Sequence, residues 1–323
     1  MKQEIFEQRH QQEWERFEQD LTELEKSRHP DADALDSFPA RYRQMCQLLA
    51  IAQERGYRTD LVERLNALVL RGHHQLYRFN TRFWQHLVTF ILVGFPVLVR
   101  QEWKMVAVAS AVFVLPGLLF YLAVLIEPSL IYGLLDAAQV TKMEDMYNPA
   151  SERFGSDRAS DSDVMMFGYY IYNNISVAFR CFASGLVFML GSVFMLLFNG
   201  LLLGGVAAHL QNLGYTSTFF PFVIGHGAFE LTAIALAGAA GLKLGYSLLV
   251  PGSQSRLSAL KDAGQTAIRL VYGVILMLII AAFVEAFWSS NHAVTDAVKY
   301  GVGTACWLFV LLYLTRAGRS HEA

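Results

Sequence analysis

Charge and cysteine are both scarce in this sequence of 323 residues. Charged side chains make up 17% of the chain, whereas soluble domains average about 25%. The three cysteines, Cys46, Cys181 and Cys306, are widely spaced and include no Cys-x-x-Cys pair. That spacing argues against a disulfide framework or a cysteine zinc site and indicates small buried side chains. The formal net charge of −2 is too small to indicate nucleic-acid binding.

The N-terminal region also lacks the pattern of a signal peptide. Its first 30 residues are rich in charged side chains and contain no apolar run. A cleavable signal peptide needs about 7–15 apolar residues in succession. We therefore expect membrane insertion to use internal apolar segments.

The charged residues are concentrated in the first quarter of the chain. Residues 1–82 hold 13 of the 26 Lys and Arg residues and 14 of the 28 Asp and Glu residues. Residues 83–323 carry the other half of the charge over a much longer stretch, in a chain that is 54% hydrophobic. This division rules out a single soluble domain and a disordered chain. It predicts an all-α polytopic membrane protein with a charged head (1–82) and an apolar body.

Helical periodicity in the head predicts a cytoplasmic three-helix bundle. Apolar residues recur every three or four positions, which places them on one face of each helix. We expect the first helix to end at Pro30, the second to cover 36–55, and the third to run from Asp60, with Glu63 completing a capping box, to about Phe83. The expected inward-facing residues are Trp14, Phe17, Leu21, Leu24, Phe38, Tyr42, Met45, Leu49, Ala52, Leu61, Leu65, Leu68, Gly72, Leu76 and Phe79. Three short helices can bury only a modest core. The bundle therefore packs on itself or on the membrane surface, or it shares part of this face with a partner or a second copy of the chain.

Apolar runs long enough to cross a membrane follow the head. A bilayer core about 30 Å thick needs about 20 apolar residues in a helix. We expect about six transmembrane helices, at 83–99, 105–126, 177–198, 219–250, 270–288 and 297–314. The short uncharged run within 199–218 is predicted as a re-entrant or half-helix element. The resulting segments are a first transmembrane hairpin (83–126), a polar cytoplasmic or interfacial segment (127–165), a transmembrane core (166–316) and a cytoplasmic tail (317–323).

The distribution of Lys and Arg orients these helices, because cytoplasmic loops carry an excess of both. If 199–218 does not cross, the basic residues that follow residue 250 and those of the tail face the same side as the head. We therefore expect both termini in the cytoplasm. Arg180, Lys243 and Arg256 then lie near cytoplasmic helix ends, where long basic side chains can reach the interface.

Glu230 is the charged residue that this topology explains least. It lies about 16 Å along the helix that begins at Phe219, near the middle of the bilayer. A charge at that depth costs about 3 kcal/mol or more and is a functional-site candidate. His226 lies one turn earlier on the same face. The remaining polar residues of this intramembrane network are Asn173, Asn174, Asn199 and Glu285.

Two interpretations of the network remain open: a buried polar network that sets helix register, and a relay for protons or a substrate. No metal site is predicted, because His226 and Glu230 offer two ligands and no third is near them in sequence. His209 is the only other candidate for a third ligand. The sequence contains no His-Glu-x-x-His motif and no readable Ser/His/Asp set, so we expect no catalytic residues, no cofactor and no enzyme activity.

Small residues mark places where helices can approach closely. Gly200 and Gly204 share the small-xxx-small spacing, as do Gly241 and Gly245, and Gly238 extends the second stripe. Both stripes are compatible with packing inside one chain and with the seam of a homodimer.

Several stretches resemble the stage II sporulation protein M family of bacterial integral membrane proteins. They are Met166–Asn174 (MFGYYIYNN), Asn199-Gly200, His226–Ile234 (HGAFELTAI), Gly238–Gly245, Pro251-Gly252 with Arg256, and Ala281–Glu285 (AAFVE). Their order and spacing extend over about residues 145–290. The head and first hairpin resemble the long form of the family, found in bacteria that do not sporulate.

The resemblance implies a multi-pass protein of the bacterial inner (cytoplasmic) membrane. The sporulation member is similar to a scaffold that recruits cell-wall hydrolases, and the long form is often encoded near a MoxR-type AAA ATPase and von Willebrand factor A proteins. Two functions are therefore expected: a non-enzymatic scaffold in envelope or cell-wall organisation, or a channel or transporter whose pathway passes Glu230 and His226. The expected partners are the lipid bilayer, a second copy of the chain and one of those protein classes.

Overall fold

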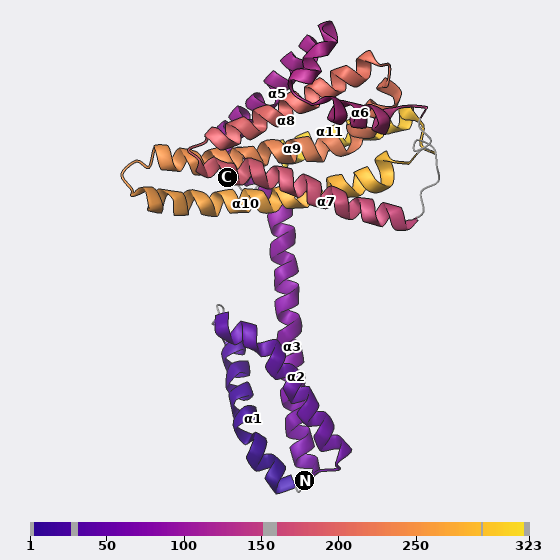
Figure 1. Cartoon of the computed structure of the whole chain (residues 1–323). Coiled ribbons are helices and arrows are strands. Elements are labelled where there is room, and N and C mark those ends of the chain that lie inside the picture. Colours follow the sequence, from indigo (N-terminus) through magenta and orange to yellow (C-terminus); the bar gives the residue numbers. More distant parts are fainter. Residues whose placement is uncertain (1–2, 27–31, 151–159, 292, 320–323) are drawn as a thin grey trace. The chain divides into compact units, whose positions relative to one another are not determined.

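The computed structural model describes residues 3–26, 32–150, 160–291 and 293–319, and every regular element within these ranges is helical (Figure 1). The all-α prediction is therefore confirmed. Contacts between residues divide the chain into two compact units, Met1–Thr89 and Phe90–Ala323. The boundary lies a few residues after the end of the charged head.

Three helices form the first unit: α1 (Gln3–Lys26), α2 (Ala32–Glu54) and α3 (Thr59–Thr89). α2 begins four residues before the expected position and accommodates Pro39 within the helix. Gly56 follows α2 with φ of +60°, a left-handed conformation that glycine adopts without strain. The expected helix ends are thus correct to within a few residues.

The first unit has its own core, built from large aromatic and aliphatic side chains. Phe17 and Phe38 stack with ring centroids 5.5 Å apart, and Gly72 lets α3 approach the Tyr42 ring, which a Cβ would meet at 2.8 Å. The side chain of Phe79 lies outside the described residues. The core residues are Phe6, Trp14, Phe17, Leu21, Leu24, Phe38, Met45, Leu48, Leu49, Ala52, Leu61, Leu65 and Leu68.

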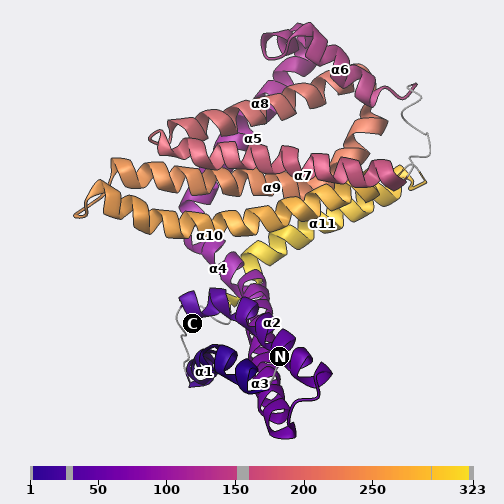
Figure 2. The ribbon, with the colours of Figure 1, turned by 60° about the horizontal axis from the view of Figure 1, so that its bottom comes forward.

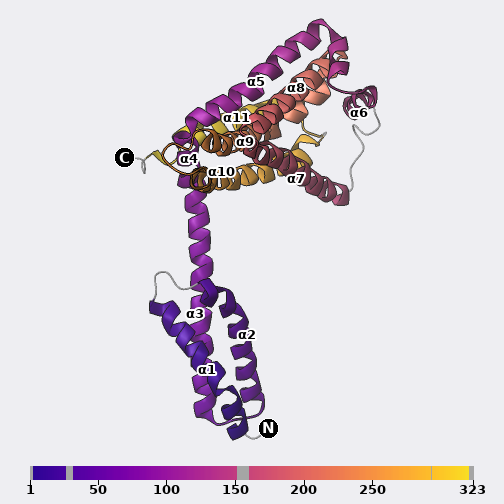
Figure 3. The ribbon, with the colours of Figure 1, turned by 60° about the vertical axis from the view of Figure 1, so that its left-hand side comes forward.

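α-Helices form most of the second unit (Figures 2 and 3). They are α4 (Phe95–Gln101), α5 (Trp103–Ile126), α7 (Ser160–Ala183), α8 (Leu190–Asn212), α9 (Thr216–Leu249), α10 (Arg256–Phe283) and α11 (Asp296–Arg316). α10 continues into a π turn, η4 (Val284–Ser289). Among the described residues, five helices are long and apolar enough to cross a membrane: α5, α8, α9, α10 with η4, and α11. The prediction of a polytopic α-helical membrane protein is confirmed, although five rather than six helices qualify.

α9 is the central helix of this unit. Over its most apolar stretch 61% of the residues are buried, against 22% in α5 and 17% in α11. Its middle section, 237–241, contains only Ala and Gly. Small side chains let neighbouring backbones come close, so α9 can pack against α7, α8, α10 and α11 at once.

The expected span at 177–198 and the expected re-entrant element at 199–218 are both wrong. α7 ends at Ala183, the chain turns through a 3-10 segment, η3 (Ser184–Leu186), and α8 then runs unbroken through residue 199. Phe188 and Met189 take positive φ values in this turn. Hydropathy misses the turn because its residues are apolar, while Gly185 lets it lie against Gly241, whose carbonyl oxygen would be 2.1 Å from a Cβ.

The expected hairpin at 83–126 differs in its first half. α3 leads into a π turn, η1 (Phe90–Gly94), and α4 is only seven residues long. Instead of running beside α5 as a span, α4 packs against α11, where the Arg100 guanidinium donates to the Leu314 carbonyl oxygen at 3.0 Å. α5 is therefore the first candidate span among the described residues.

Side-chain contacts define the two ends of the second unit. At one end Lys243 of α9 pairs with Glu102, just before α5, at 2.6 Å. At the other end Asn212, which closes α8, donates to the Val124 carbonyl near the end of α5 at 2.9 Å.

The polar segment after α5 lies at this second end, where η2 (Pro128–Gly133) and α6 (Ala137–Tyr147) pack on α8 (Figure 2). The segment 127–165 was expected on the same side as the C-terminus. Residues 127–150 instead lie at the end of α5 that is opposite to α4 and to the end of α11, because one candidate span rather than a hairpin precedes them.

Candidate functional site

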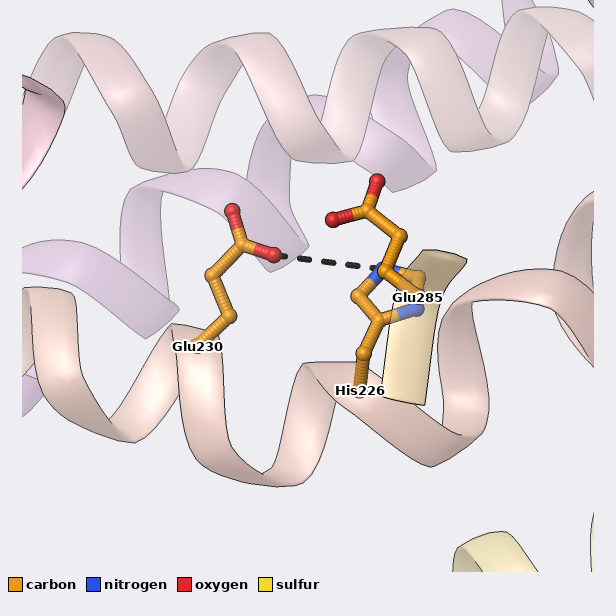
Figure 4. A group of neighbouring side chains, drawn as sticks. All are labelled: His226, Glu230 and Glu285. Atoms are coloured by element: carbon orange, nitrogen blue, oxygen red, sulfur yellow. Dashed lines mark ion pairs between the residues drawn. The ribbon is translucent and has the colours of Figure 1, made fainter. Parts of the chain in front are cut away.

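Three ionisable side chains meet between α9 and η4. His226 and Glu230 of α9 and Glu285 of η4 each offer one nitrogen or oxygen atom, and these three atoms lie within 4.8 Å of one another. Figure 4 shows His226 and Glu230 projecting from one helix toward the Glu285 carboxylate. His226 Nε2 is 3.9 Å from Glu230 Oε2. His226 and Glu285 are buried, and Glu230 is nearly so.

Local helix geometry explains why these residues converge. His226 and Glu230 are four positions apart, so they occupy one face of α9. Glu285 belongs to the π turn at the end of α10; such turns are rare and frequently occur at functional sites. Ala281, Ala282 and Ala286 surround it on α10 and η4, and all three are buried. Small side chains there leave room for the carboxylate against α9.

Neutral polar groups support two members of the cluster. His226 Nδ1 is 3.2 Å from the Ser289 hydroxyl. The Asn174 amide of α7 donates to Glu285 Oε2 at 3.5 Å and accepts a hydrogen bond from Asn173 at 3.1 Å. Lys299 of α11 donates to the Ser289 carbonyl at 2.9 Å. Groups from α7, η4 and α11 thus orient the side chains around α9.

A cavity of about 330 Å³ adjoins this cluster at the α6 end of the unit. Phe222 and Ser289 line it, and both also contact His226. Tyr147 of α6 lines it from the other side. Burial raises the pKa of the Tyr147 phenol above its usual range, and the nearby carboxyl groups of Glu285 and Glu230 raise it further. The cluster therefore lies next to a cavity with a partly polar lining.

The other predicted polar residues lie apart from the three-residue cluster. Asn199 donates to the Met195 carbonyl of its own helix at 2.7 Å. His209 pairs with Glu144 of α6 at 2.7 Å. Arg180 and Arg256 are exposed at helix ends, whereas Lys243 is held by Glu102. Of the predicted network, the structure brings together His226, Glu230, Glu285 and Asn174, with Asn173 behind Asn174.

All five predicted packing glycines lie at contacts within the chain. A Cβ on Gly200 would be 2.1 Å from the Phe113 carbonyl oxygen, and one on Gly204 would be 2.0 Å from that of Gly117. These contacts join α8 to α5. Gly238 faces Leu196 of α8, while Gly241 and Gly245 face the end of α7 and the turn before α8. The glycine stripes therefore account for packing inside one chain.

Sequence reasoning missed Ser289, Lys299 and Tyr147 as neighbours of the cluster. It included Glu285 in the network but did not pair it with His226 and Glu230, because counting along a helix gives depth but not the facing partner. The π turn that directs Glu285 inward has no recognisable sequence pattern. Its residues, VEAFWS, read as a continuation of α10.

The helices and the buried cluster define a polytopic α-helical membrane protein with a polar site between its apolar helices. Residues 106–290 match the family model of stage II sporulation protein M. The chain therefore belongs to that family. Residues 4–78, nearly all of the first unit, match a separate domain of unknown function (DUF8413).

One curated relative is also similar to part of the chain. It is the uncharacterized protein MJ0793 of Methanocaldococcus jannaschii, which is 25% identical over 126 residues, covering 38% of this chain and 69% of the relative. No solved structure matches the chain.

Proposed function

We propose that this protein is a non-enzymatic scaffold of the bacterial inner membrane that recruits a partner for envelope or cell-wall organisation. The observation that carries the proposal is the separate head: it has its own core, is a compact unit by itself and matches a domain model different from that of the body. A charged three-helix bundle attached to a membrane body is suited to binding a soluble partner. The expected partner is a MoxR-type AAA ATPase, a von Willebrand factor A protein or a cell-wall hydrolase.

The charges at the two ends of the body support a cytoplasmic position for both termini. One end of the body contains α4 and the last residues of α11. Most of its charged residues are basic: Arg100, Lys104, Arg180, Lys243, Arg256, Lys261, Arg316 and Arg319, with Glu102 and Asp262. The α6 end carries Glu127, Asp136, Glu144, Asp145 and Asp296, with Lys142 and Lys299. Because Lys and Arg are retained on the cytoplasmic side, the first end faces the cytoplasm. α7 then crosses together with the five apolar helices, and six crossings return the C-terminus to the side of the head.

Labelling of single-cysteine variants tests this orientation. Ser253→Cys lies between α9 and α10, and Ser129→Cys lies in η2, at opposite ends of the body. In a background without the native cysteines, an impermeant thiol reagent added to intact cells with a permeable outer membrane should label Ser129→Cys only. Labelling of Ser253→Cys alone would reverse the orientation.

Partner recovery tests the scaffold function. The full chain and a variant lacking residues 3–54, which removes α1 and α2, are cross-linked in native membranes, and bound proteins are identified by mass spectrometry. We expect an envelope protein or an ATPase with the full chain and its loss in the deletion. Glu230→Gln is the matched control in the body and should keep the partner. Recovery that is unchanged by the deletion would remove the support for a docking head.

A second function, transport past Glu230 and His226, is favoured by the cavity beside the cluster. Buried carboxyl and imidazole groups next to a cavity are a common arrangement in proton-coupled transport. Protein reconstituted into liposomes with a pH-sensitive dye should then show proton flux that Glu230→Gln abolishes. Equal flux in the wild type, the variant and empty liposomes would exclude it.

A further inference from the structure

We propose that His226, Glu230 and Glu285 bind one divalent transition-metal ion, with Zn²⁺ or Mn²⁺ as the fitting chemistry. This site goes beyond the scaffold function, which requires no metal. The three ligand atoms come from two elements, α9 and η4, so a bound ion would tie the end of α10 to the central helix.

The three atoms are close enough to bind a single ion once the carboxylate side chains close around it. Zn²⁺ binds His nitrogen and carboxylate oxygen at about 2.0–2.2 Å, so two ligands of a tetrahedral ion are about 3.4 Å apart. The three atoms here lie within 4.8 Å of one another. Binding therefore requires the ligand atoms to approach by up to about 1.4 Å, which a change of side-chain torsion at Glu230 and Glu285 can supply.

Charge balance in an apolar surrounding favours a divalent cation. With both carboxyl groups ionised and the imidazole neutral, the cluster carries a charge of −2, which one divalent ion cancels. Among the residues that the structure describes, no Lys or Arg forms an ion pair with Glu230 or Glu285. Lys299 donates to the Ser289 carbonyl instead. Without a cation, burial at this depth favours the protonated, neutral carboxyl groups, so a divalent ion is what would keep both of them ionised.

The groups around the cluster match those that usually support metal ligands. A metal-bound histidine generally uses its second ring nitrogen to hold an oxygen atom. Here the Ser289 hydroxyl lies 3.2 Å from His226 Nδ1, which leaves Nε2, the nitrogen that faces Glu230, free to bind an ion. Asn174 holds one oxygen of Glu285 in a similar way. One nitrogen and two oxygen ligands suit Zn²⁺ and Mn²⁺ better than the softer Cu⁺.

The cavity beside the cluster supplies a route and room for water ligands. Phe222 and Ser289 separate it from His226, and its other walls include polar groups of Tyr147, Ser217 and Thr218. Three protein ligands leave at least one position of a four-coordinate ion free. A water molecule from the cavity can fill that position.

Metal content of the purified full chain is the direct test. Protein in detergent is stripped with a chelator, loaded with ZnCl₂ or MnCl₂, desalted and measured by elemental mass spectrometry. We expect one ion per chain for the wild type and background for His226→Gln and Glu285→Gln. His209→Gln is the matched control, because it breaks a different buried His–Glu pair, and it should retain the ion. A wild type that holds no Zn²⁺, Mn²⁺ or Co²⁺ above background overturns the proposal, whatever the variants do.

Two further measurements separate a metal site from a merely structural cluster. Co²⁺ bound at this site should give visible absorption bands that are lost in Glu230→Gln. Ser289→Ala keeps all three ligands and should lower the affinity about tenfold, since supporting groups typically contribute 10–100-fold. Equal metal content and equal absorption in the wild type and in a folded Glu285→Gln variant would contradict the assignment. Partner recovery by the head does not enter these readouts, so the scaffold proposal can fail independently.

Discussion

The cores of the two units differ in the size of their buried side chains. The first unit buries Trp14, Phe17 and Phe38 beneath a charged surface. The second unit is organised around α9, where Ala and Gly dominate the buried positions, and it encloses a histidine and two carboxyl groups. In water, burying large apolar side chains drives folding. In lipid that gain is absent, so close backbone packing and internally satisfied polar groups hold helices together.

This contrast has a consequence for how each unit responds to substitution. Removing volume should damage the head most, whereas adding volume should damage the body most. Half-buried Cys46 in the head and buried Cys181 in the body report on the two units separately, because the rate at which a thiol reagent modifies each of them rises when its surroundings open.

Gly204→Val should have the largest effect, and it should be confined to the body. A side chain there meets the Gly117 carbonyl oxygen at 2.0 Å, so α5 and α8 must separate, at a cost of about 3 kcal/mol or more. We expect rapid modification of Cys181 with Cys46 unchanged, measured by mass spectrometry. Gly264→Val, at a glycine of α10 with open space around it, is the control. Protection of Cys181 in Gly204→Val would show that the α5–α8 contact is not tight.

Trp14→Ala should have the corresponding effect in the head. The indole is 2% exposed, and truncating a buried aromatic costs about 3–5 kcal/mol. Modification of Cys46 should become faster, while Cys181 stays protected. Gln19→Ala, at an exposed position of the same helix, should change neither. Simultaneous exposure of both cysteines would mean that the units unfold together.

Lys243→Met should destabilise the body to a smaller degree. The substitution leaves the Glu102 carboxylate, 17% exposed, without its partner at 2.6 Å, and an unpaired buried acceptor costs about 1–3 kcal/mol. The apparent melting temperature in detergent should fall. Adding Glu102→Gln should restore part of the loss, because the double variant no longer contains the unpaired charge. No recovery in the double variant would indicate that the lysine stem, rather than the ion pair, contributes the stability.

Glu25→Gln should have the smallest effect and completes the comparison of charges in the two units. Arg71 donates two hydrogen bonds to Glu25, at 3.0 and 2.9 Å, but the pair is partly exposed to water. Exposed pairs contribute about 1 kcal/mol at most. The difference in the free energy of unfolding of the head should disappear in about 1 M salt, where screening is nearly complete. A salt-independent loss would contradict a purely electrostatic role.

Periodicity predicted the head well and the body only in part. The head's apolar stripes were assigned to the correct faces because each helix has one face in water and one in the core. In the body almost every position is apolar, so hydropathy locates a span without locating a turn made of apolar residues. The turn between α7 and α8 was missed for this reason, and with it the unbroken course of α8.

The sequence predicted two of the three residues of the candidate site as neighbours. Depth along the helix identified Glu230, and four-residue spacing paired it with His226. Glu285 is 55 positions further along the chain from Glu230, and its approach depends on how α10 packs on α9 and on a π turn that no residue pattern indicates.

Amino-acid composition and periodicity alone establish a charged helical head, an apolar helical body and one carboxyl group too deep to be explained by topology. All three follow from one-dimensional information, because the tendency of each residue to be buried is set by its own hydrophobicity. Tertiary structure decides which helices pair, at which end the polar segment lies, and that Glu285 joins His226 and Glu230. Those outcomes depend on backbone contacts at Gly117, Gly200 and Gly204 and on the π turn, where geometry between distant segments rather than local chemistry sets the result.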